Sequence, residues 1–409
     1  MVSLKVVKMK ILIICEHFAP ETGAQALQAT KVADALHGAG HEVQVLCGVQ
    51  NMSPEPRLYP VAHVASRPQS SVRSFVARAH RRLRYEFDSI HRGSDWVRKM
   101  AREAIEISRT FEPDVVLTQS TPFRVHLIGL HLPESLRHRW LAYFSDLWPL
   151  ALTPYPYRTR LSCVLKAIQM RALAKVLTSA RGALYSNEAS VRRLARTWPG
   201  RVLPRCDVVA HIGTPASDRQ IDRKLIARYG SRFVHIGKIT RERAIPQLVD
   251  AIMSLGGAIG PTAKCSGFSF VGDVDLSFRL ACRQLECSGV VDFVGEVDPV
   301  LAHEIGHAAR ALVVIEAEMD ESPFLASKFA DYAMMRKPIL AISPAGPIRD
   351  YLKMNGGGIA ATHDVNSIAS AISTLLESDQ FANGSEALAA HFDERRVANQ
   401  YLEAFRKLL

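Results

Sequence analysis

The 409-residue chain has no apolar run that approaches the roughly 20 residues a membrane-spanning helix needs. Its first apolar run, Ile11 to Cys15, is too short for the core of a secretory signal, and no small-residue cleavage site follows it. We therefore expect a cytoplasmic protein without a membrane span.

Cysteine is sparse and unpatterned. The seven cysteines include no C-x-x-C pair, and an odd number in a long chain argues against a disulfide framework. Cys15 and Cys47 end apolar runs and are expected to be buried thiols. This usage fits a reducing compartment.

Acidic residues are outnumbered. The chain has 51 Lys and Arg against 40 Asp and Glu, a formal net charge of +11, which indicates an anionic partner such as nucleic acid, a phosphate-rich ligand or a lipid headgroup. The plain alternative is a generally basic protein. With 48% hydrophobic residues, the chain can fill two cores, as its length suggests.

The excess of positive charge is concentrated between Arg73 and Arg102. Apolar residues are interleaved with the arginines there, as in a basic amphipathic helix lying on an anionic membrane surface. A solvated helical face on the first domain explains the pattern equally well. Because no nucleic-acid motif accompanies the charge, we expect no nucleic-acid partner.

The first half of the chain alternates strand and helix signals. The apolar run 10–15 predicts a buried parallel strand, 24–39 a helix, and 42–47 a second strand. Further strands are expected at 114–118, 140–145, 182–186 and 208–212. A strand–helix–strand unit of this length begins a doubly wound sheet.

The same pattern restarts after a polar stretch. Six apolar runs are expected to form a second sheet: 233–237, 268–272, 290–295, 312–315, 339–342 and 358–361. The predicted division is a first Rossmann-like domain at 1–212, a linker at 213–230, a second Rossmann-like domain at 231–392 and a terminal amphipathic helix at 393–409. This is an α/β architecture with two Rossmann-like domains facing each other across a cleft.

Three stretches carry a resemblance to a known family: 16–24, 235–243 and 321–332 with the following Lys337-Pro338. Together with 146–149, they resemble family 4 of the glycosyltransferases, which have the GT-B fold. The resemblance extends over nearly the whole chain. It implies a C-terminal helix that can cross back to the first domain, and transfer of a sugar from a nucleotide-sugar donor with retention and without a metal or other cofactor.

The resemblance also implies a donor site in the second domain. Lys238 and Arg243 match the family's two cations with their types exchanged, and would stabilise the diphosphate leaving group catalytically. Gly237 joins them as a donor-binding residue. The ordinary alternative is two surface cations on a basic protein.

The family's paired glutamates are only partly matched. Asp331 stands where the second glutamate is expected, as a catalytic and donor-binding residue, and Lys328 lies three residues earlier on the same helical face. Pro323 occupies the place of the first glutamate, and Glu321 is a candidate substitute. The alternative is an ordinary structural Lys–Asp pair near a helix start.

The first domain would hold the acceptor, a glycan, lipid-linked or small-molecule compound, near Glu21 and Asp146. Gly23 precedes the first helix, where free N–H groups can meet a phosphate or sugar, and is a further donor-binding candidate. A plain strand–helix turn is its alternative.

Two other functional classes stay open. The proline at 323 is compatible with a catalytically degenerate GT-B binding protein, because fold does not guarantee activity. His303, Glu304 and His307 match H-E-x-x-H, a zinc hydrolase signature, but no G-x-x-H follows them. We therefore expect no metal site.

Overall fold

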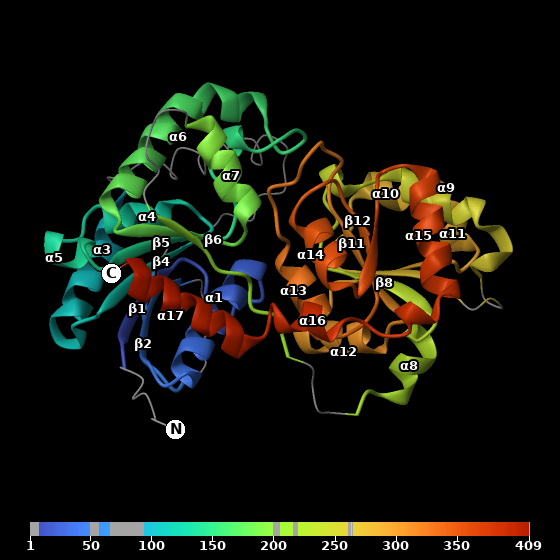
Figure 1. The fold of residues 1–409 in the computed structure, drawn as a ribbon, viewed down its shortest axis with the longest axis horizontal. Helices are drawn as coiled ribbons and strands as arrows, with labels where there is room; N and C mark the ends of the chain where they lie inside the picture. The colour runs from blue at the N-terminus through green and yellow to red at the C-terminus, as the bar shows by residue number, and fades with distance from the viewer. Residues whose placement is uncertain are drawn as a thin grey trace. The chain divides into compact units, whose positions relative to one another are not determined.

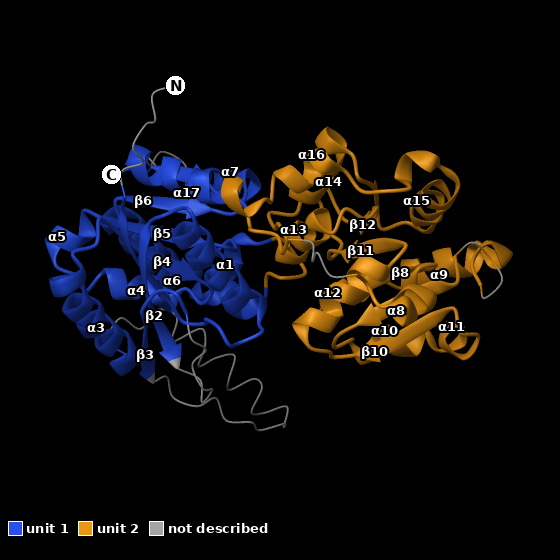
Figure 2. Ribbon diagram, turned by 90° about the horizontal axis from the view of Figure 1, so that it is seen from below, with its two compact units in different colours: residues 1–153, 159–210, 397–409 blue, residues 154–158, 211–396 orange. Residues whose placement is uncertain are grey.

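A computed structural model of the chain describes residues 8–49, 57–65, 94–198, 205–215, 220–260, 263 and 265–408. The chain divides into two compact units, each built on one sheet (Figure 2). Unit 1 comprises residues 1–153, 159–210 and 397–409, and unit 2 comprises 154–158 and 211–396.

Unit 1 contains a seven-stranded parallel sheet in the order β3-β2-β1-β4-β5-β6-β7 (Figure 1). Its strands are β1 (Lys10–Cys15), β2 (Glu42–Val49), β3 (Val61–Ala65), β4 (Val115–Ser120), β5 (Trp140–Phe144), β6 (Gly182–Tyr185) and β7 (Cys206–Val208). Its helices include α1 (Ala24–Gly38), α3 (Asp95–Phe111), α4 (Arg124–Gly129), α5 (Glu134–Arg137), α6 (Arg160–Ser179), α7 (Glu188–Thr197) and α17 (Glu394–Leu408).

Unit 2 contains a six-stranded parallel sheet in the order β10-β9-β8-β11-β12-β13. Its strands are β8 (Arg232–Ile236), β9 (Gly267–Val271), β10 (Val291–Gly295), β11 (Ala311–Ile315), β12 (Ile339–Ile342) and β13 (Gly358–Ala361). The helices are α8 (Arg223–Tyr229), α9 (Pro246–Ser254), α10 (Leu276–Ala281), α11 (Arg283–Cys287), α12 (Pro299–Ala308), α13 (Ser327–Met334), α14 (Pro347–Asn355), α15 (Val365–Glu377) and α16 (Glu386–Ala390).

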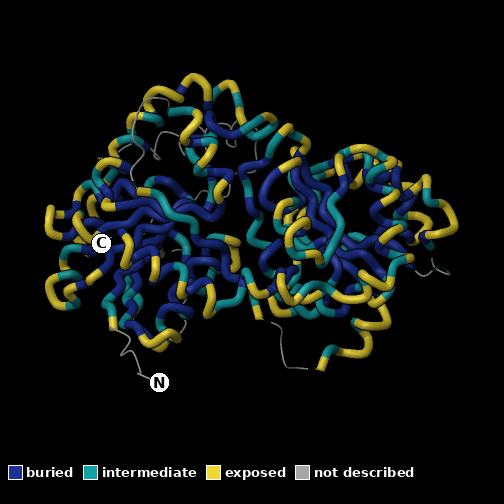
Figure 3. The backbone as a smooth tube through the Cα atoms, viewed as in Figure 1, coloured by how far each residue is buried: buried dark blue, intermediate teal, exposed yellow. Residues whose placement is uncertain are grey.

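Both sheets are covered by helices on both faces, which is why their strands are nearly continuous apolar runs rather than alternating ones. The central strands are almost fully buried, as the dark tube in Figure 3 shows. In unit 2, α9 and α15 pack on one face, and α12 and α13 contact β8 and β11. The two predicted Rossmann-like domains are thus confirmed.

The domain division differs in detail from the sequence expectation. The units divide after Ala210, and the expected linker 213–230 contains α8, which belongs to unit 2. The chain returns to unit 1 at Val397 through α17, where Tyr401 is fully buried beside Tyr143. Strand β3 was not expected, and β7 ends at Val208.

A short piece of sequence changes units. Pro154–Arg158 lies between two segments of unit 1 along the chain but packs into unit 2. No sequence signal marks this exchange.

No helix in the described part of the chain is both long and apolar enough to cross a membrane. Most of the basic segment Arg73–Arg102 lies outside the described residues, which resume at Ser94.

Candidate functional site

The strand order of unit 2 reverses between β8 and β11. Connections leave these two strands in opposite directions, so a crevice opens at their carboxyl ends, where open α/β sheets bind ligands. Gly237 follows β8 and Glu316 follows β11 at this edge. The switch point therefore defines where a site is expected in this unit.

Arg243 and Glu316 form an ion pair at the switch point. Arg243 donates from Nε to Glu316 Oε1 at 3.2 Å and from Nη2 to Oε2 at 3.3 Å. Only 1% of the Glu316 side chain is exposed, against 22% for Arg243. Burial alone lowers the pKa of Arg243, but the Glu316 carboxylate outweighs it and the pKa is raised, so this guanidinium is always charged.

Tyr157 completes the pair from the segment Pro154–Arg158. Its hydroxyl accepts from Arg243 Nε at 3.0 Å and donates to the Glu316 carboxylate. Its ring packs edge-on against Phe324, with centroids 5.1 Å apart. Burial and then the Glu316 charge raise the pKa of Tyr157, so the phenol stays protonated. Glu316 is thereby held by a cation, a phenol and the backbone N–H of Ala317.

A second cation, Lys328, lies at the start of α13. Its Nζ is 3.3 Å from Nε2 of His235, whose Nδ1 is 2.9 Å from the carbonyl oxygen of Val313. Burial and the Lys328 charge hold the pKa of His235 well below its ordinary value, so the ring is neutral. The partners assign its proton to Nδ1, leaving Nε2 to accept from Lys328.

Burial lowers the pKa of Lys328 to about 7, and Arg243 adds to the shift while Glu316 opposes it. Gly237 makes room for this side chain. With φ at +111°, Gly237 occupies the left-handed region, and a Cβ there would lie 2.9 Å from Lys328 Nζ. Lys328 therefore lies next to a backbone position that favours glycine, while Arg243 pairs with the Glu316 carboxylate.

The cluster of Arg243, Glu316, Lys328 and His235 has the chemistry of an anion site. When both cations are protonated, its net charge is +1. Among the described residues, Nη1 of Arg243 has no acceptor, and Lys328 donates only to His235. Desolvated donors of this kind suit a phosphate, which gains bidentate and charge-assisted hydrogen bonds.

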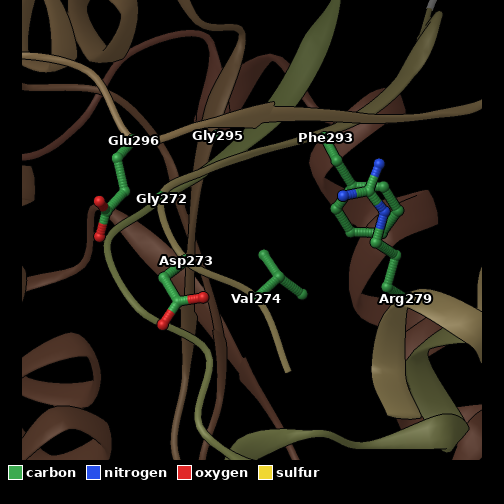
Figure 4. Close-up of a pocket in the computed structure, with 7 residues that line it drawn as sticks. All are labelled: Gly272, Asp273, Val274, Arg279, Phe293, Gly295 and Glu296. Carbon is green, nitrogen blue, oxygen red and sulfur yellow. The ribbon is translucent and has the colours of Figure 1, made fainter. Parts of the chain in front are cut away.

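A pocket of about 450 Å³ lies at the ends of the neighbouring strands β9 and β10 (Figure 4). The guanidinium of Arg279 stacks on the Phe293 ring, 5.0 Å from its centroid, and the carboxylates of Asp273 and Glu296 lie across from them. Lys238 pairs with Asp273 at the pocket edge. The pocket and the anion site thus occupy adjacent positions along one sheet edge.

The structure separates two residues that the sequence grouped together. Arg243 is in the buried cluster, whereas Lys238 is 64% exposed and lies in the surface pair with Asp273. Lys328 and Gly237, both expected at the donor site, lie close together, since a Cβ on Gly237 would be 2.9 Å from Lys328 Nζ.

The acidic residues of the third stretch have structural partners. Asp331 Oδ1 accepts from the backbone nitrogen of Thr214 at 2.7 Å and from its hydroxyl at 2.8 Å, which ties α13 to the chain entering unit 2. Glu321 forms an isolated bridge with Ala345. A substitution at Asp331 therefore changes a packing contact as well as any ligand contact.

The residues expected in unit 1 lie at the carboxyl edge of its sheet. Glu21 accepts from His17 Nδ1 at 2.7 Å, and Asp146 follows β5, with Oδ2 3.5 Å from the Thr121 hydroxyl. Gly23 caps α1 with φ at −66°, a conformation open to any residue, and a Cβ would meet nothing within 4 Å. Nothing in the backbone at Gly23 therefore requires a glycine.

The pair His303 and His307 lies on α12 with ring centroids 4.6 Å apart. Within the ranges that the structure describes, no group of three or more His, Cys, Asp and Glu side chains is placed to hold a metal ion. This pair therefore has no third protein ligand there.

Sequence reasoning did not assign a donor role to Glu316, His235 or Tyr157. An acid directly after the buried strand 312–315 was a usable signal for Glu316, because strand ends line such sites. Nothing in the sequence connects Tyr157 with Arg243, because 86 residues separate them.

No protein-family profile matches the chain, and no curated protein matches it in sequence. Solved structures do. Sucrose-phosphate synthase from Thermosynechococcus elongatus is 15% identical with a TM-score of 0.69, covering 98% of this chain and 99% of that one. HepE of Anabaena, in complex with UDP and glucose, is 14% identical with a TM-score of 0.64, covering 97% and 99%.

A trehalose-phosphate synthase from Burkholderia xenovorans, in complex with glucose-6-phosphate, is 11% identical with a TM-score of 0.66 and covers 98% and 99%. These likenesses, over nearly the whole chain, define the fold as the two-domain α/β GT-B class.

Proposed function

We propose that the protein is a glycosyltransferase that takes a nucleotide-sugar donor in unit 2. The observation that carries the proposal is a pair of cations at the sheet's switch point. Arg243 is ion-paired with the buried Glu316, and Lys328 Nζ lies 3.3 Å from His235 Nε2. The same GT-B fold is seen in HepE in complex with UDP and glucose.

The nucleotide and the diphosphate of the donor would lie side by side along the carboxyl edge of the unit 2 sheet. The nucleotide would occupy the pocket at β9 and β10, where the Arg279–Phe293 stack offers a flat surface to a base. The diphosphate would reach Lys328 and Nη1 of Arg243, with Lys238 at the rim. Asp331 and Glu321 stay candidates for donor hydroxyls.

The proposed chemistry is departure of the nucleoside diphosphate from the sugar carbon as an acceptor hydroxyl attacks. Negative charge grows on the phosphate oxygens during departure, and Arg243 and Lys328 would stabilise it more in the transition state than in the ground state. Glu316, Tyr157 and His235 already hold the two cations in place. The site would therefore need little reorganisation when the leaving group departs. The proposal includes retention of the anomeric configuration of the sugar, as the resemblance to family 4 implies. It also includes transfer without a metal ion.

The acceptor is proposed to bind at the carboxyl edge of unit 1, near Glu21 and Asp146. A glycan, a lipid-linked sugar or a small molecule would each present the hydroxyl needed. A cytoplasmic enzyme that associates peripherally with an anionic membrane through Arg73–Arg102 fits the charge of that segment.

A panel of UDP-, GDP- and ADP-linked sugars tests the donor proposal by thermal shift. A donor at a hundred times its Kd should stabilise the native state by about 2.7 kcal/mol. Phe293→Ala should weaken binding of the matching nucleotide, whereas Phe381→Ala, which does not line the pocket, should not. A panel without any shift would contradict the proposal.

Pro323 motivates the second candidate, a GT-B protein that binds a nucleotide sugar without transferring it. The two are distinguished by turnover. Release of free nucleoside diphosphate in the presence of acceptor extracts supports the enzyme, and tight binding without release supports the binding protein.

A further inference from the structure

Helix α6 is 20 residues long and carries charge of one sign only. It contains four cations and no acidic residue: Arg160, Lys166, Arg171 and Lys175. All four are exposed, and none forms an ion pair with another described residue. Elsewhere in unit 1 some exposed arginines are paired, as Arg98 is with Asp95 on α3. The charge of α6 is therefore uncompensated.

Large apolar side chains are exposed among these cations. Val164 is 77% exposed and Ile168 is 49% exposed. Residues four, seven or eight positions apart share one face of a helix, so both lie in a stripe with Arg160, Arg171 and Lys175. We call these five side chains the outer face of α6.

The opposite face of α6 is packed into the protein, which determines which side chains of the helix point outward. Leu165, Leu173, Val176 and Leu177 are buried, and the last three belong to the core of unit 1. The N-terminus is capped by Thr159, whose hydroxyl accepts from the backbone nitrogen of Ser162 at 3.2 Å. A rigid, anchored helix thus presents cations with aliphatic side chains between them.

We propose that the outer face of α6 docks on an anionic lipid surface. Lysine and arginine would reach the headgroups while Val164 and Ile168 enter the boundary with the acyl chains, as in interfacial amphipathic helices. This inference is independent of the donor site and of the segment Arg73–Arg102.

Other occupants match the outer face less well. A nucleic acid would satisfy the cations but offer no apolar environment to Val164 and Ile168. A second copy would bring cations against cations, and the arginine-rich segment 66–93 carries charge of the same sign. An anionic lipid surface supplies both kinds of contact.

Co-sedimentation with vesicles tests the proposal. The full chain should bind phosphatidylcholine vesicles that contain about 30% phosphatidylserine, bind pure phosphatidylcholine weakly, and be released by salt. The variant R160E/R171E/K175E should bind at least about tenfold more weakly, because each basic residue near the surface adds to the attraction. K353E/R395E/R396E changes the charge equally in unit 2 and should keep most of the binding.

A second pair of variants distinguishes insertion of apolar side chains into the lipid from attraction by charge alone. V164S/I168S should weaken vesicle binding, whereas M253S/L276S, which alters two exposed apolar residues of unit 2, should not. All substituted side chains are exposed, so unfolding midpoints should stay close to that of the unaltered protein, and this is measured for each variant.

Three results would overturn the proposal. The unaltered protein could fail to bind anionic vesicles, or the two charge-reversal variants could lose binding equally, which would reflect net charge only. Full binding by both α6 variants would assign the membrane contact to another segment.

Discussion

The pairing of Arg243 with Glu316 affects how a substitution at the proposed donor site is interpreted. A buried ion pair is costly to assemble, but removing one member costs more, since it leaves the other charge buried without a partner. Loss of ligand binding and loss of stability therefore have to be measured separately at this position.

Arg243→Ala should lower the free energy of unfolding by about 3–5 kcal/mol, because Glu316 stays buried without its cation. Urea denaturation measures this. The double variant R243A/E316Q removes the unpaired charge and should recover most of the stability while donor affinity stays low. If R243A alone proved fully stable, the ion pair would not be the one described.

Lys328 should make donor binding depend on pH. Its pKa of about 7 in the free protein means that it loses its proton as the pH rises above 7, whereas a bound diphosphate favours the charged form and raises that pKa. Affinity for a nucleotide sugar should therefore fall as the pH is raised from 7 to 9, measured by calorimetry.

The other groups facing Lys328 do not titrate in that range. The pKa of His235 is well below its ordinary value, and Arg243 stays charged. Lys328→Arg keeps a permanent charge, so its binding should be nearly independent of pH between 7 and 9. A parallel decline in this variant would assign the dependence to another group.

At the scale of elements, the segment Pro154–Arg158 is the least expected feature. It leaves unit 1, places one phenol against the Arg243–Glu316 pair, and returns to unit 1 at Thr159. Hydrogen bonds to charged groups stabilise a fold more than hydrogen bonds between neutral groups do. The Tyr157 hydroxyl therefore contributes considerable stability although the segment has only five residues.

Tyr157→Phe should lower the free energy of unfolding by about 1.5–3 kcal/mol, because the Glu316 carboxylate loses a hydrogen-bond donor. Denaturant unfolding monitored on unit 2 measures the change. Tyr155→Phe is the matched control, since Tyr155 lies two residues away and is 74% exposed. Equal effects of the two substitutions would contradict a specific role for the Tyr157 hydroxyl.

At the scale of the whole molecule, each unit has its own sheet and core, and the chain is threaded through both. Helix α17 packs on unit 1 although almost all of unit 2 precedes it in sequence, with Leu408 against Gly182 and Arg181 Nε bonded to the carbonyl oxygen of Leu408 at 2.9 Å. The C-terminus is therefore part of the unit that contains the N-terminus.

Removal of residues 397–409 should destabilise unit 1 and leave nucleotide binding in unit 2 largely intact. The deletion exposes surface that Tyr401, Phe405 and Leu408 now cover, all of them at most 1% exposed. Calorimetry should show an earlier transition for unit 1, while an added nucleotide still raises the other transition. A loss of nucleotide binding equal to the loss of unit 1 stability would argue against separate units.

The sequence by itself determined the class of fold. Buried parallel strands read as short apolar runs separated by helix-length segments, so two successive series predicted two Rossmann-like sheets, and the structure confirms them. The sequence also singled out Lys328 and Arg243 as candidate site residues, because both fall in short motifs that resemble those of a known family. Their roles in donor binding stay predictions.

Only the tertiary structure decided which of these residues share an environment. Glu316 meets Arg243 across 73 residues, and Tyr157 meets both from a segment that the sequence pattern assigned to the other domain. Local propensity and periodicity report on neighbours along the chain. Desolvation lowers the pKa of Lys328 and keeps the His235 ring neutral. It depends on what packs around a group from distant segments, and the fold alone brings those segments together.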